Sequence, residues 1–279
     1  MKDISYENRL ELSNTYHNIG MIHFYESNND LALANFQQEL DIELEILEST
    51  HPNLAVTYHH IARVYGKKQN SKKKLEYFHK ELNIRLTTPK LNYSDLAANY
   101  HNLSLTYYEL LGFVDAFKMN EEALKRACEH LSNDYKFLIT LYCDAGAMHF
   151  TEKDYDKSLE IYEKAIEIGL NYLSVDDVNL KNIYEILDEI YYKKNDLIDL
   201  SSKNPMFSKS NISQTKQFTS LTYYTIGNIF NKMNNYERAL AFYQNVHQIE
   251  LQMLSTNRLY IEKYQDSIEQ AKQNLHWSN

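Results

Sequence analysis

"YHNIGMIHFY" (Tyr16–Tyr25) returns as "YHHIARVYGK" (Tyr58–Lys67) and as "YHNLSLTYYE" (Tyr100–Glu109), each time 42 residues further along the chain. Later copies begin with tyrosine at Tyr142, Tyr184 and Tyr223, the last after a step of 39 residues. A fixed period of this size indicates stacked helical repeats. Several classes of helical repeat share periods of about 40–47 residues, so the residues inside each copy must decide between them.

Each copy places an apolar residue three positions after the tyrosine, usually a small residue at four, and in most copies a ring at seven. This spacing puts all four side chains on one face of a helix, and the small residue lets a neighbouring helix approach closely. The small position is held by Gly20, Ala62, Ser104, Gly146 and Gly227, with Asp188 in the fifth copy. A second helix then carries an aromatic residue in four copies, at Phe36, Phe78, Tyr162 and Tyr243, whereas Asn120 takes that place in the third.

This pattern resembles the tetratricopeptide repeat, and its 42-residue form is similar to the repeats of kinesin light chains. The segment "THPNLAVTYHHIARVY" (Thr50–Tyr65) is especially similar to the start of the first repeat helix in that group. Pro52 suits the first turn of a helix, where its missing N–H costs nothing. The resemblance covers roughly residues 9–254.

The resemblance implies an all-α fold, a right-handed superhelical solenoid of about six antiparallel helix pairs. We expect repeats 1 to 5 within residues 1–200, the fifth of them degenerate, and repeat 6 within residues 218–254. Between them, residues 201–217 are rich in Ser, Asn and Lys and contain Pro205, which favours an irregular loop. Residues 255–279 keep helical spacing with one polar side, as a capping helix requires.

Composition excludes several classes of protein. The net charge of −9 argues against a dominant role in nucleic-acid binding, which usually needs a basic face. The opening residues "MKDISYENRL" contain no apolar segment of a secretory signal, and no apolar run approaches the length of a membrane span. The two cysteines, Cys128 and Cys143, form no CxxC motif. We therefore expect a cytoplasmic protein.

Candidate catalytic and metal-binding groups have simpler explanations. His17, His59 and His101 occupy equivalent positions in successive repeats, about a helix diameter or more apart, so they are not expected to meet at one ion. Cys143 and His149 lack any accompanying oxyanion hole, and the six glycines form no phosphate-binding loop. Carboxylates along the second helix, including Glu39 and Glu43, are interpreted as a solvated face. We expect no enzyme activity, no metal and no cofactor.

The resemblance also implies a binding surface, because the first helix of each repeat lines the concave side. The residue two positions after the tyrosine faces that groove and is commonly asparagine, whose amide both donates and accepts hydrogen bonds. The predicted peptide-binding residues are His17, Asn18, Met21, His59, His60, Arg63, Lys67, His101, Asn102 and Asp144. Because the groove positions of the first two repeats include no carboxylate, a partner with an acidic segment is expected. The alternative is that these side chains are ordinary polar surface.

The sequence therefore predicts a non-enzymatic protein–protein interaction scaffold that holds an extended peptide or protein segment in its concave groove. Two alternatives stay open. The chain could be an accessory or regulatory module of a larger enzyme or signalling protein, or it could bind single-stranded nucleic acid, which its acidic balance disfavours.

Overall fold

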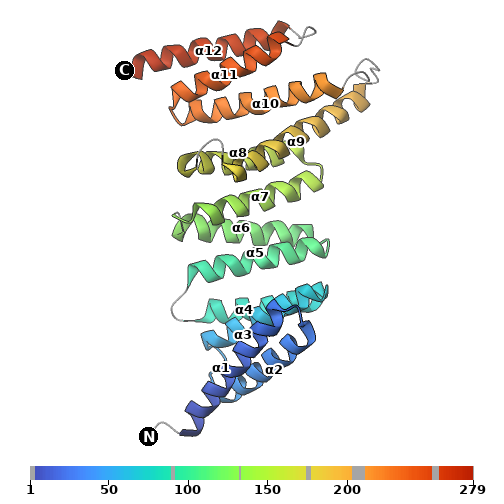
Figure 1. Cartoon of the computed structure of the whole chain (residues 1–279), viewed down its shortest axis with the longest axis vertical. Coiled ribbons are helices and arrows are strands. Elements are labelled where there is room, and N and C mark those ends of the chain that lie inside the picture. The colour runs from blue at the N-terminus through green and yellow to red at the C-terminus, as the bar shows by residue number, and fades with distance from the viewer. Residues whose placement is uncertain are drawn as a thin grey trace. The chain divides into compact units, whose positions relative to one another are not determined.

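The computed structural model describes residues 4–88, 92–131, 133–173, 177–202, 211–252 and 258–278, and over these residues the chain is helical without any strand (Figure 1). The all-α, tetratricopeptide-like solenoid is thus confirmed. The chain divides into two compact units, Met1–Asp134 and Tyr135–Asn279.

The first unit consists of three antiparallel helix hairpins, each made from two consecutive helices. The helices are α1 (Ile4–Tyr25), α2 (Asn29–Ile46), α3 (Pro52–Lys67), α4 (Ser71–Thr87), α5 (Tyr93–Glu109) and α6 (Phe113–His130). Neighbouring hairpins pack through α2 against α3 and through α4 against α5. His51 and Asn92 cap the helices that follow them: His51 Nδ1 accepts from the Asn53 N–H, and Asn92 Oδ1 accepts from the Ser94 N–H.

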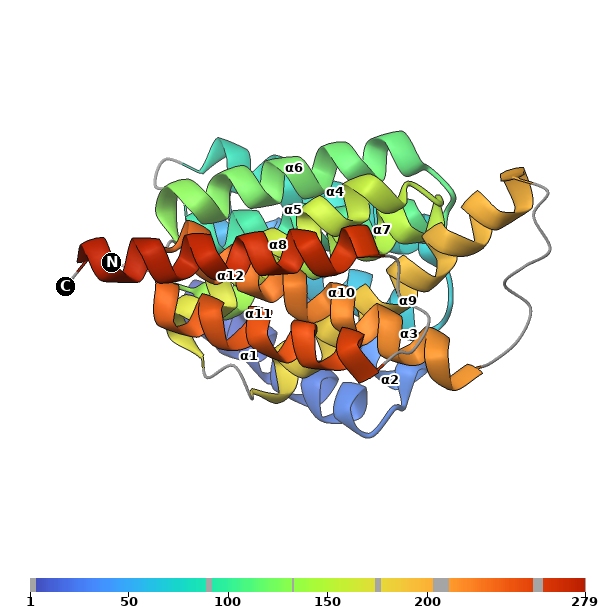
Figure 2. The ribbon, with the colours of Figure 1, turned by 90° about the horizontal axis from the view of Figure 1, so that it is seen from above.

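The described residues of the second unit form two hairpins and two further helices. The helices are α7 (Tyr135–Thr151), α8 (Tyr155–Tyr172), α9 (Val178–Ser202), α10 (Asn211–Lys232), α11 (Tyr236–Gln252) and α12 (Arg258–Ser278). Pairs α7/α8 and α10/α11 close as hairpins, α9 packs against both α8 and α10, and α12 packs against α11. Helix α9 extends past its neighbours in both views (Figures 1 and 2).

All five hairpins share the same turn. Its central residue adopts the left-handed conformation although it is not glycine, at Ser27, Gln69, Leu111, Lys153 and Asn234. The next N–H then donates to a carbonyl five residues back, as Asn28 does to His23 over 2.8 Å and Asp154 to His149 over 3.0 Å. This pattern terminates a helix and satisfies its last carbonyls. In the fifth repeat the chain stays helical through the equivalent position, Asn195, so α9 forms no hairpin there.

The small positions allow the close packing that their pattern predicts. A Cβ added to Gly20 would lie 2.7 Å from the Phe36 ring, one on Gly146 2.7 Å from the Tyr162 ring, and one on Gly227 2.6 Å from the Tyr243 ring. A hydroxyl joins the two helices of two hairpins: Ser104 Oγ donates to the Ala116 carbonyl, and Ser158 Oγ to the Gly146 carbonyl, each over 2.8 Å.

The predicted irregular segment 201–217 needs correction where the structure describes it. Ser201 and Ser202 end α9, and residues 211–217 form the first turns of α10, while residues 203–210, with Pro205, lie outside the described residues. Ser, Asn and Thr lower helix propensity by only tenths of a kcal/mol each. The packed continuation of α10, with Ile226 and Phe230 buried, outweighs that cost.

The expected capping segment is helical over Arg258–Ser278, and α12 buries Tyr264, Ile268 and Ala271. The residues between these positions, such as Gln265 and Glu269, are exposed. One face of α12 therefore covers α11 while the other is polar. Whether α12 keeps the solenoid from aggregating stays a prediction.

Candidate protein-interaction site

The histidines that follow the repeat tyrosines on α1 and α3 are hydrogen-bonded to buried glutamates. His17 Nδ1 bonds to Glu39 Oε1 over 2.9 Å, and His59 Nδ1 bonds to Glu81 Oε2 over 3.1 Å. Both glutamates lie 22 residues after their histidine, on the second helix of the same hairpin. His17 and His59 are half-buried, so each presents only part of its ring to a ligand.

His60 belongs to the packing of the first unit. Its ring stacks on Phe36 with centroids 5.4 Å apart, and it lies edge-on to His17 at 5.0 Å. Nδ1 is buried with no hydrogen-bond partner among the described residues. Burial, followed by the charges of His59, His17 and Arg63, lowers the pKa of His60 to about 3. His60 is therefore neutral near pH 7 and cannot supply positive charge to an acidic partner.

The predicted cationic residues contact an aromatic ring of the first hairpin. Arg63 and Lys67 lie 4.6 and 4.0 Å from the centroid of the Phe24 ring, and Lys67 Nζ donates to the Phe24 carbonyl over 2.6 Å. Lys67 thereby satisfies the C-terminal end of α1, where a cation is favoured. Met21 packs against the hydrophobic core of the same hairpin.

The remaining predicted residues are distributed over three helices. Asn18 is exposed on α1, whereas His101 and Asn102 are half-buried on α5, and Asp144 is half-buried on α7. In the third hairpin the residue 22 positions after His101 is Ala123, which cannot repeat the histidine–glutamate pair. The structure thus groups His17, Asn18 and His60 on adjoining parts of α1 and α3, with Asp144 in the other unit.

Of the carboxylates interpreted as a solvated face, Asp41 and Glu45 are exposed as expected, whereas Glu39 and Glu43 are buried between hairpins. Glu39 and Glu43 on α2 are only 4% and 3% exposed, and they face Thr57 on α3. Thr57 Oγ1 lies 3.1 Å from Glu39 Oε1 and 2.6 Å from Glu43 Oε2. Burial raises the pKa of Glu43 to about 7, partly offset by the hydrogen bond to Thr57. Sequence periodicity missed this cluster because its members come from two different repeats.

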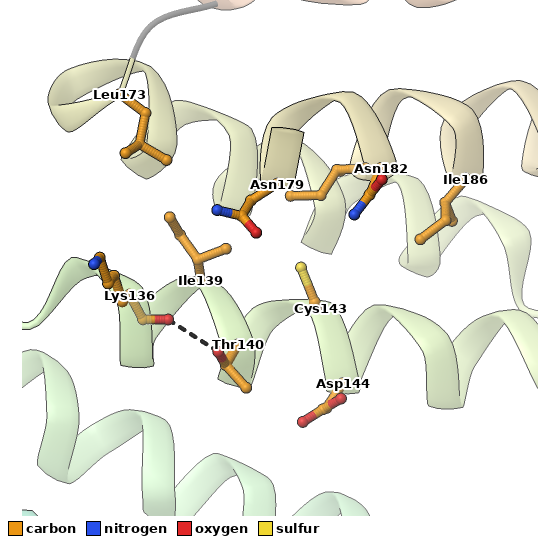
Figure 3. A pocket seen from close by; sticks show the side chains of 10 residues that line it. Lys136, Ile139, Thr140, Cys143, Asp144, Leu173, Asn179, Asn182 and Ile186 are labelled. Atoms are coloured by element: carbon orange, nitrogen blue, oxygen red, sulfur yellow. Dashed lines mark hydrogen bonds between the residues drawn. The ribbon is translucent and has the colours of Figure 1, made fainter. Parts of the chain in front are cut away.

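A pocket of about 400 Å³ lies between α7 and α9, within the second unit (Figure 3). Both helices contribute side chains at three- and four-residue spacing, so one face of each lines it. The lining residues are Lys136, Ile139, Thr140, Cys143, Asp144 and Leu173 from the α7/α8 hairpin, and Asn179, Asn182, Ile183 and Ile186 from α9.

The pocket is lined by the apolar side chains of Ile139, Leu173, Ile183 and Ile186 and carries amide groups on its α9 wall. Figure 3 shows the side chains of Asn179 and Asn182 projecting toward α7, with the Cys143 sulfur between them. Burial, and then the nearby Asp144 carboxylate, raise the pKa of Cys143 to about 12, so it presents a neutral thiol. Of the lining residues the sequence predicted only Asp144. The helical spacing of Asn179, Asn182 and Ile186 could have indicated that they share one face of a helix. The fifth repeat lacks its second helix, and so its residues do not match the repeat pattern.

Over the described residues, no group of three or more His, Cys, Asp and Glu side chains is placed to hold a metal ion. The described helices also include none with the length and apolar character needed to cross a membrane.

Family models described as tetratricopeptide repeats match residues 11–87, 139–169 and 221–250. Several solved structures share the fold. Kinesin light chain TPR-like repeats from Podosopora anserina are 13% identical, covering 89% of this chain and 99% of that chain with a TM-score of 0.53. The apo form of RapI is 14% identical, covering 95% and 98% with a TM-score of 0.58. Aspartyl phosphate phosphatase F from Bacillus subtilis is 12% identical, covering 98% and 72% with a TM-score of 0.57.

A search of curated proteins gave no significant match. At 12–14% identity the structural likenesses establish the fold alone. The matched segments nevertheless coincide with hairpins of the structure: residues 11–87 with α1 to α4, residues 139–169 with α7/α8, and residues 221–250 with α10/α11. Three segments of the chain thus match tetratricopeptide repeats, and its fold resembles that of kinesin light chain repeats.

Proposed function

We propose that this protein is a non-enzymatic interaction scaffold that binds an extended segment of a partner protein, with the α7/α9 pocket as the principal contact. The observation that carries the proposal is the pocket itself, which combines apolar lining side chains with exposed side-chain amides. Its volume of about 400 Å³ falls in the usual range for a binding site, roughly 300–1,000 Å³.

The apolar and the amide side chains of the pocket suit different parts of an extended peptide. Ile139, Ile183 and Ile186 would surround an apolar side chain, while Asn179 and Asn182 would pair with backbone N–H and C=O groups. The α7 wall runs from Lys136 to Asp144, about 12 Å of helix at about 1.5 Å per residue. An extended chain covers about 3.3 Å per residue, so about four residues of the partner would fit.

In the first unit, Asn18 and Asn102 would offer further amide contacts, and His17, Met21, His59 and His101 would form the surface around them. The cationic side chains there, Arg63 and Lys67, remain the proposed contact for an acidic part of the partner. Their positions over Phe24 leave Lys67 exposed at the end of α3. The acidic segment is therefore expected to depend on Lys67 more than on any histidine.

Site-specific crosslinking tests this proposal. A photoreactive amino acid is placed at Asn182 in the pocket, and in a second protein at Asn171, an exposed asparagine on α8. Crosslinking in native extract, followed by mass spectrometry, identifies the partner segment, which is then synthesised. Crosslinking of a partner at Asn182 but not at Asn171 supports the proposal. Crosslinking at Asn171 but not at Asn182 would instead place the partner on the surface formed by the second helix of each hairpin.

The identified peptide allows a matched comparison of affinities. The double change Asn179→Ala with Asn182→Ala removes two hydrogen-bonding groups worth about 1 kcal/mol each. Affinity should therefore fall roughly 30-fold, since about 1.4 kcal/mol is tenfold. Asn171→Ala should leave it unchanged. Equal affinities of the double variant and the unaltered protein would exclude the pocket as the binding site.

A further inference from the structure

A cluster of hydrogen-bonding groups is buried where α1, α2 and α3 meet, and the proposed function does not use it. It consists of His17 from α1, Glu39 and Glu43 from α2, and Thr57 from α3. The contacts run in sequence, from His17 to Glu39 over 2.9 Å, Glu39 to Thr57 over 3.1 Å, and Thr57 to Glu43 over 2.6 Å.

The number of available hydrogens decides how these contacts are made. A threonine hydroxyl donates one hydrogen bond and accepts others, whereas an ionised carboxylate only accepts. The Thr57 hydroxyl also lies 3.2 Å from the Asn53 carbonyl, which is a third acceptor. If Glu39 and Glu43 were both ionised, all three acceptors would compete for the single Thr57 hydrogen, and the Thr57 oxygen would face at least one carboxylate without a hydrogen between them. A proton on Glu43 removes the conflict, because Glu43 then donates to Thr57 and Thr57 donates to Glu39.

The charges of the cluster point in the same direction. Glu39 Oε2 is buried with no hydrogen-bond partner among the described residues, so the site is poorly equipped for a second negative charge. With His17 protonated, Glu39 ionised and Glu43 protonated, the cluster is neutral. Without the two protons it would hold two negative charges in a buried space.

We propose that the junction of α1, α2 and α3 is a proton-binding site, in which protonated Glu43 donates a hydrogen bond to Thr57, so that the first two hairpins pack more tightly in the protonated state. The fold thereby contains a pH-sensitive connection between its first repeats. His17 connects this proton-binding site to the surface, because its ring is hydrogen-bonded to Glu39 and is also partly exposed, next to Asn18 in the chain.

The groups facing Glu43 from each neighbouring helix are few. Glu39 precedes it on α2, and its negative charge raises the pKa of Glu43, while His17 on α1 lowers it. From α3 the facing side chain is Thr57, and α3 also carries His60, which is neutral near pH 7. The main cause of the raised pKa is burial of Glu43.

The direction of the pH effect follows from these groups. The hydrogen bond to Glu39 raises the pKa of His17, and burial raises that of Glu43. The folded state therefore binds more protons than the unfolded chain, so stability falls as pH rises. For Glu43 the stabilisation is complete below its ordinary pKa of 4.5 and is lost as pH rises through about 7.

Carboxyl-carbon NMR of the full chain, labelled with ¹³C-glutamate, tests the proposal directly. One glutamate should titrate with a midpoint near pH 7, and that signal should be absent from Glu43→Gln. The glutamine side chain of this variant can still donate to Thr57 through its amide, so the variant should fold. The control is Glu45→Gln, which replaces an exposed α2 carboxylate paired with Arg9 and should keep the signal.

A second variant keeps the proposal testable if Glu43→Gln does not fold. Thr57→Val removes the hydroxyl that is hydrogen-bonded to Glu43, so the near-neutral midpoint should shift. A near-neutral signal that persists in Glu43→Gln would overturn the proposal. The same holds for a midpoint unmoved by Thr57→Val, or for glutamates that all titrate near their ordinary pKa.

Discussion

The α2/α3 and α8/α9 junctions occupy equivalent places in the repeat yet are built from opposite chemistry. At α2/α3 the buried positions hold Glu39, Glu43 and Thr57, which form one hydrogen-bonded cluster. Three periods of 42 residues later, the same positions at α8/α9 hold Ala165, Gly169 and Ile183, all buried. One backbone architecture therefore accepts either a polar or an apolar junction.

The α4/α5 junction is intermediate and shows how buried charge is compensated. Glu81 keeps the position of Glu39, but Arg85 replaces Glu43, and its Nε donates to Glu81 over 2.8 Å. Arg85 also pairs with Asp95 over 2.6 Å, which fixes the start of α5. Here an arginine neutralises the carboxylate, whereas at α2/α3 we assign that role to a proton.

The largest expected effect comes from placing a carboxylate in the apolar junction. Ala165→Glu would bury a charge in the apolar cluster that includes Ile139, Leu180 and Ile183. We expect a loss of about 3–5 kcal/mol in the free energy of unfolding, measured by urea denaturation. Asn171→Glu, on the exposed face of the same helix, should change it by less than about 0.5 kcal/mol. Equal losses would mean that the α8/α9 junction is not packed as described.

Removing the arginine from the intermediate junction should have the next largest effect. Arg85→Met keeps much of the side-chain length but leaves Glu81 buried with only His59 bonded to it among the contacts described above. A loss of about 3 kcal/mol is expected in the same urea assay. Lys80→Met, which breaks the exposed pair with Glu76, serves as control and should cost below about 1 kcal/mol. A small effect at Arg85 would show that Glu81 is stable without its cation.

Removing the bridging hydroxyl should be milder. Thr57→Val retains the shape of the side chain and deprives Glu39 and Glu43 of their common partner, so about 2 kcal/mol should be lost at pH near 7. Thr15→Val removes an exposed hydroxyl that bonds to the Glu11 carbonyl one turn earlier, and it should be nearly neutral. If both variants unfold at the same urea concentration as the unaltered protein, Thr57 does not hold the carboxylates together.

The smallest effect distinguishes a structural junction from a binding surface. Asn182→Ala shortens an exposed side chain of the α9 wall, so stability should change by less than about 0.5 kcal/mol while affinity for the identified peptide drops roughly fivefold. Thermal unfolding and binding titration of one preparation measure both quantities. A clear loss of stability without loss of affinity would place Asn182 in the packing.

The sequence predicts the hairpins well because their packing is local. The tyrosine, the small residue and the aromatic ring of one repeat meet within a short stretch of chain, as Gly20 and Phe36 do. The junctions are harder, because burial on a second helix depends on the first helix of the next repeat. Glu39 and Glu43 alternate with polar residues and therefore resemble a solvated face until α3 covers them.

The candidate site shows the same limit. The spacing correctly places the histidines on the first helices, but it gives no sign of their glutamate partners 22 residues away. The α7/α9 pocket depends on a fifth repeat in which α9 continues through the position of the usual turn. A pattern built from the other repeats treats that region as degenerate, and so it misses Asn179 and Asn182.

Hydrogen exchange of the folded full-length protein, measured at several pH values and corrected for intrinsic exchange rates, tests the contrast between the two junctions most directly. Between about pH 6 and about pH 8, protection of amides in α2 and α3 should fall, since protons on Glu43 and His17 are lost from the folded state. Protection in α8 and α9 should change far less, and Glu43→Gln should reduce the difference. Protection at α2 and α3 that is constant or rises with pH would contradict a proton held at this junction.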